Sequence, residues 1–214
     1  ITAALDRAGY DAPRLSEREM IDAAQAMLGG LYRPVPLDEL LKRDLAAAFP
    51  VANYERWLES LPPKKRHAFS HAGDPARHWA VRTVNGVPSF IVPRLKRGKL
   101  VIMPQMPRGA TPGAHYHDMA APPDHLYMAA YLYLREQEKA DAIVHLGTHG
   151  TQEWLPGKDR GLAADDDPFL AVGDVPVFYP YIQDNVGEAL QARRRGRAVT
   201  ISHQTPPFAP SGLY

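Results

Sequence analysis

The sequence predicts an α/β protein in which a helical N-terminal segment precedes a mostly parallel, Rossmann-like (doubly wound) sheet with flanking helices. Apolar residues recur at helical spacing over residues 1–63. From residue 87 onward, short apolar runs alternate with helical stretches. Continuous apolar strands separated by helices are typical of βαβ units, and therefore of parallel sheets.

The N-terminal segment, 1–63, is expected to contain three helices. "LSEREMIDAAQAMLGG" offers Ser16 as the N-cap and Glu19 as its capping-box partner, with Gly29 and Gly30 as the stop signal. "PLDELLKRDLAAAF" repeats the amphipathic pattern until Pro50, and "VANYERWLESL" follows it. Residues 64–86 are polar and are expected to form an irregular connection.

Residues 87–214 are expected to form the α/β domain. Its strands are predicted in "VPSFIVP", "KLVIMP", "DAIVHLG", "VPVFYPYI" and "AVTIS". Its helices are predicted in "APPDHLYMAAYLYLREQEKA", capped by Asp124, and in "NVGEALQARRRGR", capped by Asn185. Open parallel sheets bind ligands beyond the carboxyl ends of their strands. The glycine- and histidine-bearing segments after these strands are therefore expected to carry the chemistry.

Composition narrows the class of protein. The 214 residues include no cysteine, which excludes disulfides, zinc–cysteine sites and a thiol nucleophile, and fits a cytoplasmic protein. A net charge of +1 argues against a general nucleic-acid binder. No apolar run reaches the roughly 20 residues that cross a bilayer, and the first residues do not resemble a signal peptide. Basic runs at 62–67, 93–99 and 192–197 are either solvated faces or contacts for anionic groups.

One motif combines metal-binding and acid–base residue types. His145, His149 and Glu153 are spaced four residues apart, and Gly147 and Gly150 flank the second histidine. The glycines argue against a continuous helix, so this is not the helical pair of zinc proteases. A turn could still gather these side chains into a metal or acid–base site. The alternative is a hydrogen-bonded core histidine, a turn residue and a helix-capping glutamate.

A second cluster lies in "HYHDMAAPPDH", where His115 and His117 would point the same way in an extended segment. Asp118 follows them and could join a metal site, whereas Asp124 is expected to cap a helix. The acidic run 165–167 could begin another helix and complement its dipole, and the alternative is a metal role. His203 is expected to be structural. Imidazoles and carboxylates without cysteine suit Co, Zn, Ni or Fe.

Four stretches together resemble one family. They are "PQMPRG" at 104–109, "YHD" with "PPDHLYMAAYLYL" over 116–134, "HLGTHGTQEWLPGK" at 145–158, and "YPYIQDNVGEALQARRRGRAVTISHQTPP" at 179–207. In this order they resemble the large subunit of aerobic cobaltochelatase, CobN, and its relative, the H-type subunit of magnesium chelatase. The chain then looks like an internal fragment of a much longer subunit. It departs from the family in its acidic loop 162–176, in "DNVGEA", which lacks the usual proline, and in Gln152.

The resemblance implies a part of an enzyme that inserts a metal into a tetrapyrrole. In the cobalt branch, Co(II) enters hydrogenobyrinic acid a,c-diamide during cobalamin biosynthesis, and in the magnesium branch the substrate is protoporphyrin IX. In both branches the large subunit binds macrocycle and metal, while two AAA-type ATPase partner subunits hydrolyse ATP. The fragment alone is expected to be inactive. A non-catalytic docking domain of the same subunit is the alternative, and a stand-alone metal-dependent hydrolase is a third hypothesis.

The resemblance also implies roles for individual residues. Metallation removes protons from ring nitrogens, so Glu153 is expected to be a metal ligand or proton acceptor, with His149 and His145 beside it. The expected metal ligands are His145, His149, Glu153, His117 and Asp118. The groups expected to contact the tetrapyrrole are Arg108, Lys158, Trp154 and His117; the two cations suit carboxylate side chains of the macrocycle.

Overall fold

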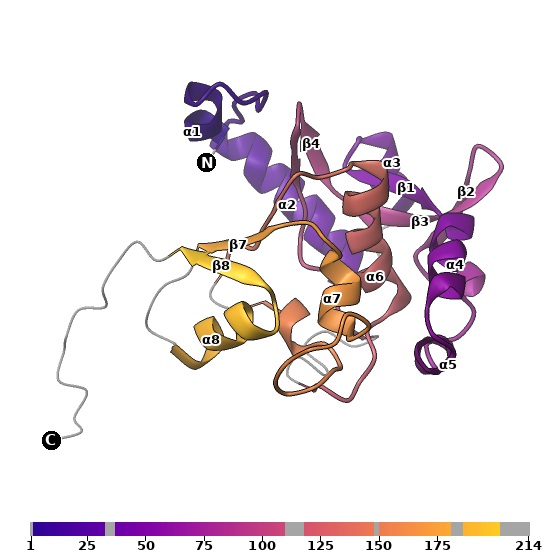
Figure 1. Cartoon of the computed structure of the whole chain (residues 1–214). Helices are drawn as coiled ribbons and strands as arrows, with labels where there is room; N and C mark the ends of the chain where they lie inside the picture. The colour runs from indigo at the N-terminus through magenta and orange to yellow at the C-terminus, as the bar shows by residue number, and fades with distance from the viewer. Residues whose placement is uncertain (1, 33–36, 110–117, 148–149, 181–185, 202–214) are drawn as a thin grey trace, which may run out of the picture. The chain divides into compact units, whose positions relative to one another are not determined.

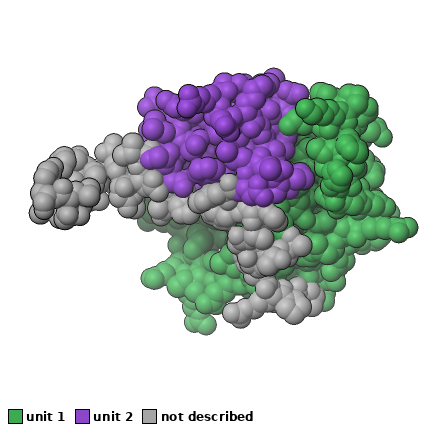
Figure 2. All heavy atoms as spheres, turned by 90° about the horizontal axis from the view of Figure 1, so that it is seen from below, with its two compact units in different colours: residues 1–114, 123–133 green, residues 115–122, 134–214 purple. Residues whose placement is uncertain are grey.

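The computed structural model describes residues 2–32, 37–109, 118–147, 150–180 and 186–201 (Figure 1). The chain forms two compact units (Figure 2): unit 1 comprises residues 1–114 and 123–133, and unit 2 comprises residues 115–122 and 134–214. Each unit combines helices with strands, so the predicted α/β class is confirmed. The domain boundaries expected from the sequence, 1–63, 64–86 and 87–214, remain a prediction.

Unit 1 combines helices with antiparallel strands. Its helices are α1 (Thr2–Arg7), α2 (Glu17–Tyr32), α3 (Leu37–Lys42), α4 (Val51–Ser60), α5 (Pro63–Ser70) and α6 (His125–Leu132), with a 3₁₀ turn at Pro75–Arg77. Its strands are β1 (Ala46–Pro50), β2 (Val81–Val84), β3 (Val87–Pro93), β4 (Leu95–Arg97) and β5 (Leu100–Ile102). β3 lies between β1 and β2, and β4 pairs with β5; all these pairs are antiparallel.

The start of α2 follows its sequence signal, but its end does not. The Glu19 N–H donates to Ser16 Oγ at 3.2 Å, and the Glu19 carboxylate accepts from the Ser16 N–H at 2.8 Å. This is the predicted capping box. The predicted stop at Gly29-Gly30 is wrong, because α2 continues to Tyr32. A Cβ at Gly30 would lie 2.7 Å from Leu40 Cδ1, so this glycine allows α2 to pack closely on α3.

The helix predicted over "PLDELLKRDLAAAF" is wrong in its second half. α3 ends at Lys42, and residues 46–50 form β1, in which Ala48 lies opposite Ile91 of β3. Asp44 adopts a φ of 54° between the two elements, and Arg94 donates to its carboxylate at 2.7 Å. Pairing and burial against β3 therefore outweigh the helical propensity of the alanines.

Two further segments, 87–102 and 64–86, differ in structure from what the sequence predicts. "VPSFIVP" and "KLVIMP" do form strands, β3 and β5, but both belong to antiparallel sheets. The connection expected to be irregular over 64–86 contains most of α5 and all of β2. A tight turn joins β2 to β3 at Asn85-Gly86, where φ is 50° and 80°; this turn suits the twist of a hairpin.

The helix predicted after "APPD" is present and forms the centre of unit 1. All eight residues of α6 are buried, as expected for a helix that is apolar on every side. It packs against β3, and a π-helical turn, Tyr133–Gln137, follows it. No helix among the described residues could span a membrane.

Unit 2 contains the parallel sheet that the sequence predicts. Its strands are β6 (Ile143–Val144), β7 (Val177–Pro180) and β8 (Ala198–Ile201), with β7 in the middle. Between them run a 3₁₀ turn (Gln152–Trp154), α7 (Asp167–Val172) and α8 (Val186–Arg194). Successive side chains alternate between the two faces of a strand. On one face Ile143, Val177, Tyr179 and Ala198 are buried, while Val144, Val199 and Ile201 on the other are exposed. The "HLGTHGTQEW" segment leaves the carboxyl end of β6.

Candidate functional site

His145 follows β6 directly and extends the parallel ladder. Its N–H donates to the Phe178 carbonyl in β7 at 2.9 Å. Its imidazole meets the ring of Tyr179 edge-on, with centroids 5.8 Å apart and planes at 88°. Burial lowers the pKa of His145 to about 4. The imidazole is therefore neutral at pH 7, the form that binds a metal or accepts a proton.

Glu153 lies in the 3₁₀ turn and is only 1% exposed. Its carboxylate accepts a hydrogen bond from the Gly150 N–H at 3.1 Å. A Cβ added at Gly150 would lie 2.9 Å from one carboxylate oxygen of Glu153 and 3.4 Å from the Tyr179 hydroxyl. The backbone at Gly150 can approach both groups because this residue has no side chain.

Tyr179 links the two predicted residues. Its ring contacts His145, while its hydroxyl lies beside Gly150, next to the carboxylate of Glu153. An imidazole, a phenol and a carboxylate are thus brought together at the end of β6. Tyr179 is not among the site residues predicted from the sequence. The signal that could have found it is the alternation in "VPVFYPYI", which places Tyr179 on the same buried face as Val177.

Trp154 and Lys158 both follow Glu153 in the sequence and have different partners. The indole N–H of Trp154 donates to Glu188 Oε2 of α8 at 3.1 Å. The ammonium of Lys158 lies 3.4 Å from Asp166 Oδ2, and the Lys158 side chain is 59% exposed. Lys158 therefore remains accessible to an anionic group in solution.

The acidic run at 165–167 begins a helix, as predicted. α7 starts at Asp167, and Asp166 occupies the N-cap position. The Asp166 carboxylate accepts from the Ala163 N–H at 2.7 Å. Burial acts to raise the pKa of Asp166, but hydrogen bonds from Ala163 and Lys158 outweigh it and lower that pKa. The Asp166 side chain thus holds together the loop that connects the motif to α7.

The other predicted site residues are distributed over both units. Arg108 belongs to unit 1, where its side chain is buried and its carbonyl accepts from the Asp124 N–H at 2.9 Å. Asp118 is exposed in unit 2, and its carboxylate accepts from the Ala120 N–H at 2.8 Å. Five residues named in the sequence predictions lie outside the described residues: His115, His117, His149, Asn185 and His203.

Within the residues that the structure describes, no three histidine, aspartate or glutamate side chains are grouped so that they could hold a metal. His145 and Glu153 are the two expected ligands that can be located in the motif. Together they supply an imidazole and a carboxylate, a donor pair that suits Co, Zn, Ni or Fe.

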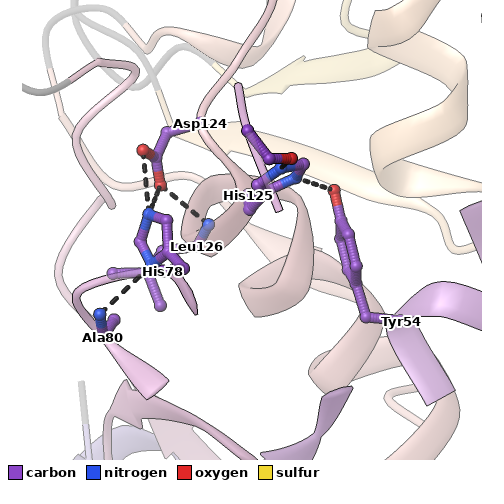
Figure 3. Close-up of polar contacts among 7 residues, drawn as sticks. Tyr54, His78, Ala80, Asp124, His125 and Leu126 are labelled. Atoms are coloured by element: carbon purple, nitrogen blue, oxygen red, sulfur yellow. Dashed lines mark hydrogen bonds and ion pairs between the residues drawn. The ribbon is translucent and has the colours of Figure 1, made fainter. Parts of the chain in front are cut away.

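Unit 1 contains a separate buried polar cluster (Figure 3). His78 Nε2 lies 2.9 Å from Asp124 Oδ1, and the other carboxylate oxygen is 3.0 Å away. The Ala80 N–H donates to His78 Nδ1 at 3.2 Å, so the ring proton is on Nε2 and points to Asp124. Asp124 Oδ1 also accepts from the Leu126 N–H at 2.8 Å. The predicted cap of α6 is confirmed, and it also binds His78.

His125 completes this cluster. Its Nε2 donates to the Gly73 carbonyl at 3.0 Å, and its Nδ1 accepts from the Tyr54 hydroxyl at 2.8 Å. Burial lowers the pKa of His125, opposed by the Gly73 bond and the charge of Asp124. The ring nitrogens of both His78 and His125 are occupied by protein groups. We therefore assign these histidines to the architecture of unit 1.

Comparison with known proteins identifies the class of protein to which this α/β chain and its motif belong. Residues 1–214 match the family model described as CobN/Magnesium Chelatase. The chain therefore belongs to the CobN/magnesium chelatase family, and the resemblance seen in its motifs is confirmed.

Individual relatives come from both branches of the family. The whole chain is 35% identical to the aerobic cobaltochelatase subunit CobN of Pseudomonas aeruginosa and covers 17% of it. Over 43% of the chain, identity to the H-type subunit of magnesium chelatase from Rhodobacter capsulatus is 45%, covering 8% of that protein. The catalytic subunit of cobaltochelatase from Mycobacterium tuberculosis superposes with a TM-score of 0.76 and 33% identity, over 96% of this chain and 18% of that one. The chain thus spans less than a fifth of each relative.

Proposed function

We propose that this chain is part of the large, metal- and tetrapyrrole-binding subunit of an ATP-dependent cobaltochelatase. That enzyme inserts Co(II) into hydrogenobyrinic acid a,c-diamide in cobalamin biosynthesis. Similarity to two cobaltochelatase subunits over nearly the whole chain supports this branch. The observation that carries the proposal is the position of Glu153, whose carboxylate lies in the family motif beside Tyr179 and Gly150.

The proposed chemistry uses the residues at the end of β6. Metal insertion strips water from the ion and removes N–H protons from the macrocycle. Glu153 acts as a weak metal ligand or as the acceptor of a ring proton. Neutral His145 offers a second donor, supported by its low pKa of about 4. His149 is the third proposed ligand in the motif, and His117 and Asp118 are second choices for the metal.

The proposed contacts with the macrocycle come from two kinds of side chain, cations and rings. Lys158, exposed at the end of the motif, pairs with a carboxylate side chain of the tetrapyrrole. Arg108, buried in unit 1, is a separate proposal for the same role. Trp154 and His117 offer ring surfaces to the macrocycle. In this proposal two AAA-type partner subunits hydrolyse ATP in the cytoplasm, and this chain does not.

The decisive test is Glu153→Gln in the full-length subunit assembled with its partner subunits. Cobalt insertion is followed by the absorbance of hydrogenobyrinic acid a,c-diamide. We expect the rate to fall about 10²–10⁴-fold, the usual contribution of a positioned proton acceptor, while macrocycle binding is retained. Glu136→Gln is the matched control, because Glu136 is an exposed carboxylate of the same unit. A rate for Glu153→Gln within a few-fold of Glu136→Gln would refute the proposal.

The magnesium branch is the second candidate, favoured by the 45% identity to an H-type magnesium-chelatase subunit over 92 residues. The same assay with Mg²⁺ and protoporphyrin IX distinguishes the branches. Insertion of Mg²⁺, without insertion of Co(II), would assign the chain to the H-type subunit.

A docking role is the third candidate, because Glu153 is buried and bonds to backbone. In that case Glu153→Gln leaves metal insertion intact. Exposed cations such as Arg193 and Arg194 would then contact a partner subunit. Neutralising both of them would weaken assembly of the complex without changing macrocycle binding.

A further inference from the structure

Arg195 is a buried cation that binds the family motif through its backbone. The residue follows α8 and is 1% exposed. Its guanidinium donates from Nε to the Glu153 carbonyl at 2.7 Å, from Nη2 to Leu155 at 2.6 Å, and from Nη1 to Lys158. One side chain thus holds three carbonyls of a six-residue segment that lies about 40 positions earlier in the sequence.

The geometry of α8 explains how Arg195 reaches the motif. Glu188 and Arg195 are seven residues apart, which places them two turns apart on the same face of the helix. The Arg195 N–H donates to the Gln191 carbonyl at 2.7 Å, so the helical hydrogen-bond pattern continues to this residue. Glu188 binds the indole of Trp154 at one end of this face, and Arg195 binds the carbonyls at the other.

Gly196 lets the end of α8 lie close to the motif. A Cβ at this position would be 2.6 Å from the Ala192 carbonyl and 3.1 Å from Gln152 Oε1. The Gln152 amide in turn donates to the Pro168 carbonyl at 2.6 Å, which ties the same turn to α7. The turn that carries Glu153 is therefore held between two helices.

We propose that Arg195 is a positioning residue, which fixes the backbone of residues 153–158 and thereby places the Glu153 carboxylate beside Gly150 and Tyr179. The inference rests on the proposed function of Glu153, because it gives Arg195 a role through that group. Arg195 binds the Glu153 carbonyl and leaves the carboxylate on the Gly150 side of the turn. Rigid placement matters, because displacing a reacting group by about 1 Å can cost about a hundredfold in rate.

Arginine is required by geometry as well as by charge. Its planar fork presents donors in several directions, whereas a lysine ammonium is a single nitrogen on a flexible stem. Burial lowers the pKa of Arg195, and the charges of Asp159 and Asp166 oppose that effect. Lysine at 195 would keep a cation but could not bond to all three carbonyls at once.

Hydrogen exchange of the full-length subunit tests the structural step. In Arg195→Gln and Arg195→Lys we expect the amides of residues 151–158 to exchange at least about tenfold faster, while the β7 amides stay protected. Arg194→Gln is the matched control, because it removes the same charge from an exposed neighbour, and we expect no change at 151–158. Wild-type exchange at 151–158 in both Arg195 variants would overturn the proposal. Should Arg195→Gln fail to fold, Arg195→Lys alone decides.

A double-mutant comparison tests whether Arg195 acts through Glu153. We expect Arg195→Lys to lower the insertion rate about a hundredfold with little change in macrocycle affinity, and to add almost nothing when Glu153 is already Gln. An equal further loss in the Glu153→Gln background would overturn the link to Glu153. If Glu153→Gln is active, the proposed function fails. Faster exchange at 151–158 would then still support Arg195 as the residue that fixes this segment.

Discussion

The Tyr54 hydroxyl donates a hydrogen bond to His125 Nδ1 over 2.8 Å, and both side chains are fully buried (Figure 3). Because His125 Nε2 donates to the Gly73 carbonyl, the imidazole has protein partners at both nitrogens. Tyr54→Phe removes the donor and leaves a buried acceptor unsatisfied. We expect the free energy of unfolding of unit 1 to fall by about 1–3 kcal/mol, measured by hydrogen exchange of the α6 amides in urea.

Tyr10 provides the matched control for this substitution, because it is 65% exposed. Tyr10→Phe removes the same hydroxyl group and should change the free energy of unfolding by no more than about 0.5 kcal/mol. Equal effects of the two substitutions would show that the Tyr54–His125 bond contributes nothing specific.

Stability should also depend on pH through His125 and His145. Burial lowers the pKa of His125 and lowers that of His145 to about 4, whereas both groups titrate near 6.5 in an unfolded chain. The unfolded state therefore binds more protons below about pH 6.5. The free energy of unfolding should be highest above about pH 6.5 and should fall as the pH drops toward 4.

Chemical denaturation at a series of pH values measures this dependence. His145→Asn should flatten the slope between about pH 6.5 and 4, because its neutral side chain takes up no proton there. His67→Gln is the control, since His67 is exposed on α5, and it should retain the wild-type slope. Wild-type stability that rises on acidification would contradict the assigned burial effect.

Sequence signals predicted the features that neighbouring residues determine. The capping box of Ser16 and Glu19 and the Asp124 cap depend on residues within one helical turn. β1 was not predictable in the same way. Its alanines favour a helix locally, and only pairing with β3, some 40 residues later, makes them a strand.

The residues of the candidate site also differ in whether their neighbours in sequence predict them. His145 and Glu153 can be selected from their types and spacing within one motif. Tyr179 and Arg195 reach that motif from other strands and helices, so nothing near them in sequence indicates the contact. "ARRRGR" suggests a solvated basic run or an anion contact, and Arg193 and Arg194 are indeed exposed. Arg195 differs because the end of α8 turns it inward toward three carbonyls.

Gly150→Ala should impair the site with little effect on stability. The added Cβ would lie 2.9 Å and 3.3 Å from the carboxylate oxygens of Glu153 and 3.4 Å from the Tyr179 hydroxyl. The flexible end of Glu153 can move away, which limits the cost in unfolding free energy to about 1 kcal/mol but displaces the proposed proton acceptor. We expect a loss of metal insertion of about tenfold or more in the full-length subunit, with wild-type macrocycle binding. Unchanged insertion would mean that this position of Glu153 is not the working one.

The contact between Trp154 and Glu188 should contribute measurably to holding the motif on α8. The indole N–H donates to a carboxylate oxygen at 3.1 Å, and hydrogen bonds to charged acceptors are stronger than neutral ones. Trp154→Phe keeps an aromatic ring but removes the donor, and Glu188→Ala removes the acceptor. Denaturation of both single variants and the double variant gives their coupling energy, which we expect to be about 1–2 kcal/mol. A coupling near zero would show that α8 is joined to the motif through Arg195 and packing alone.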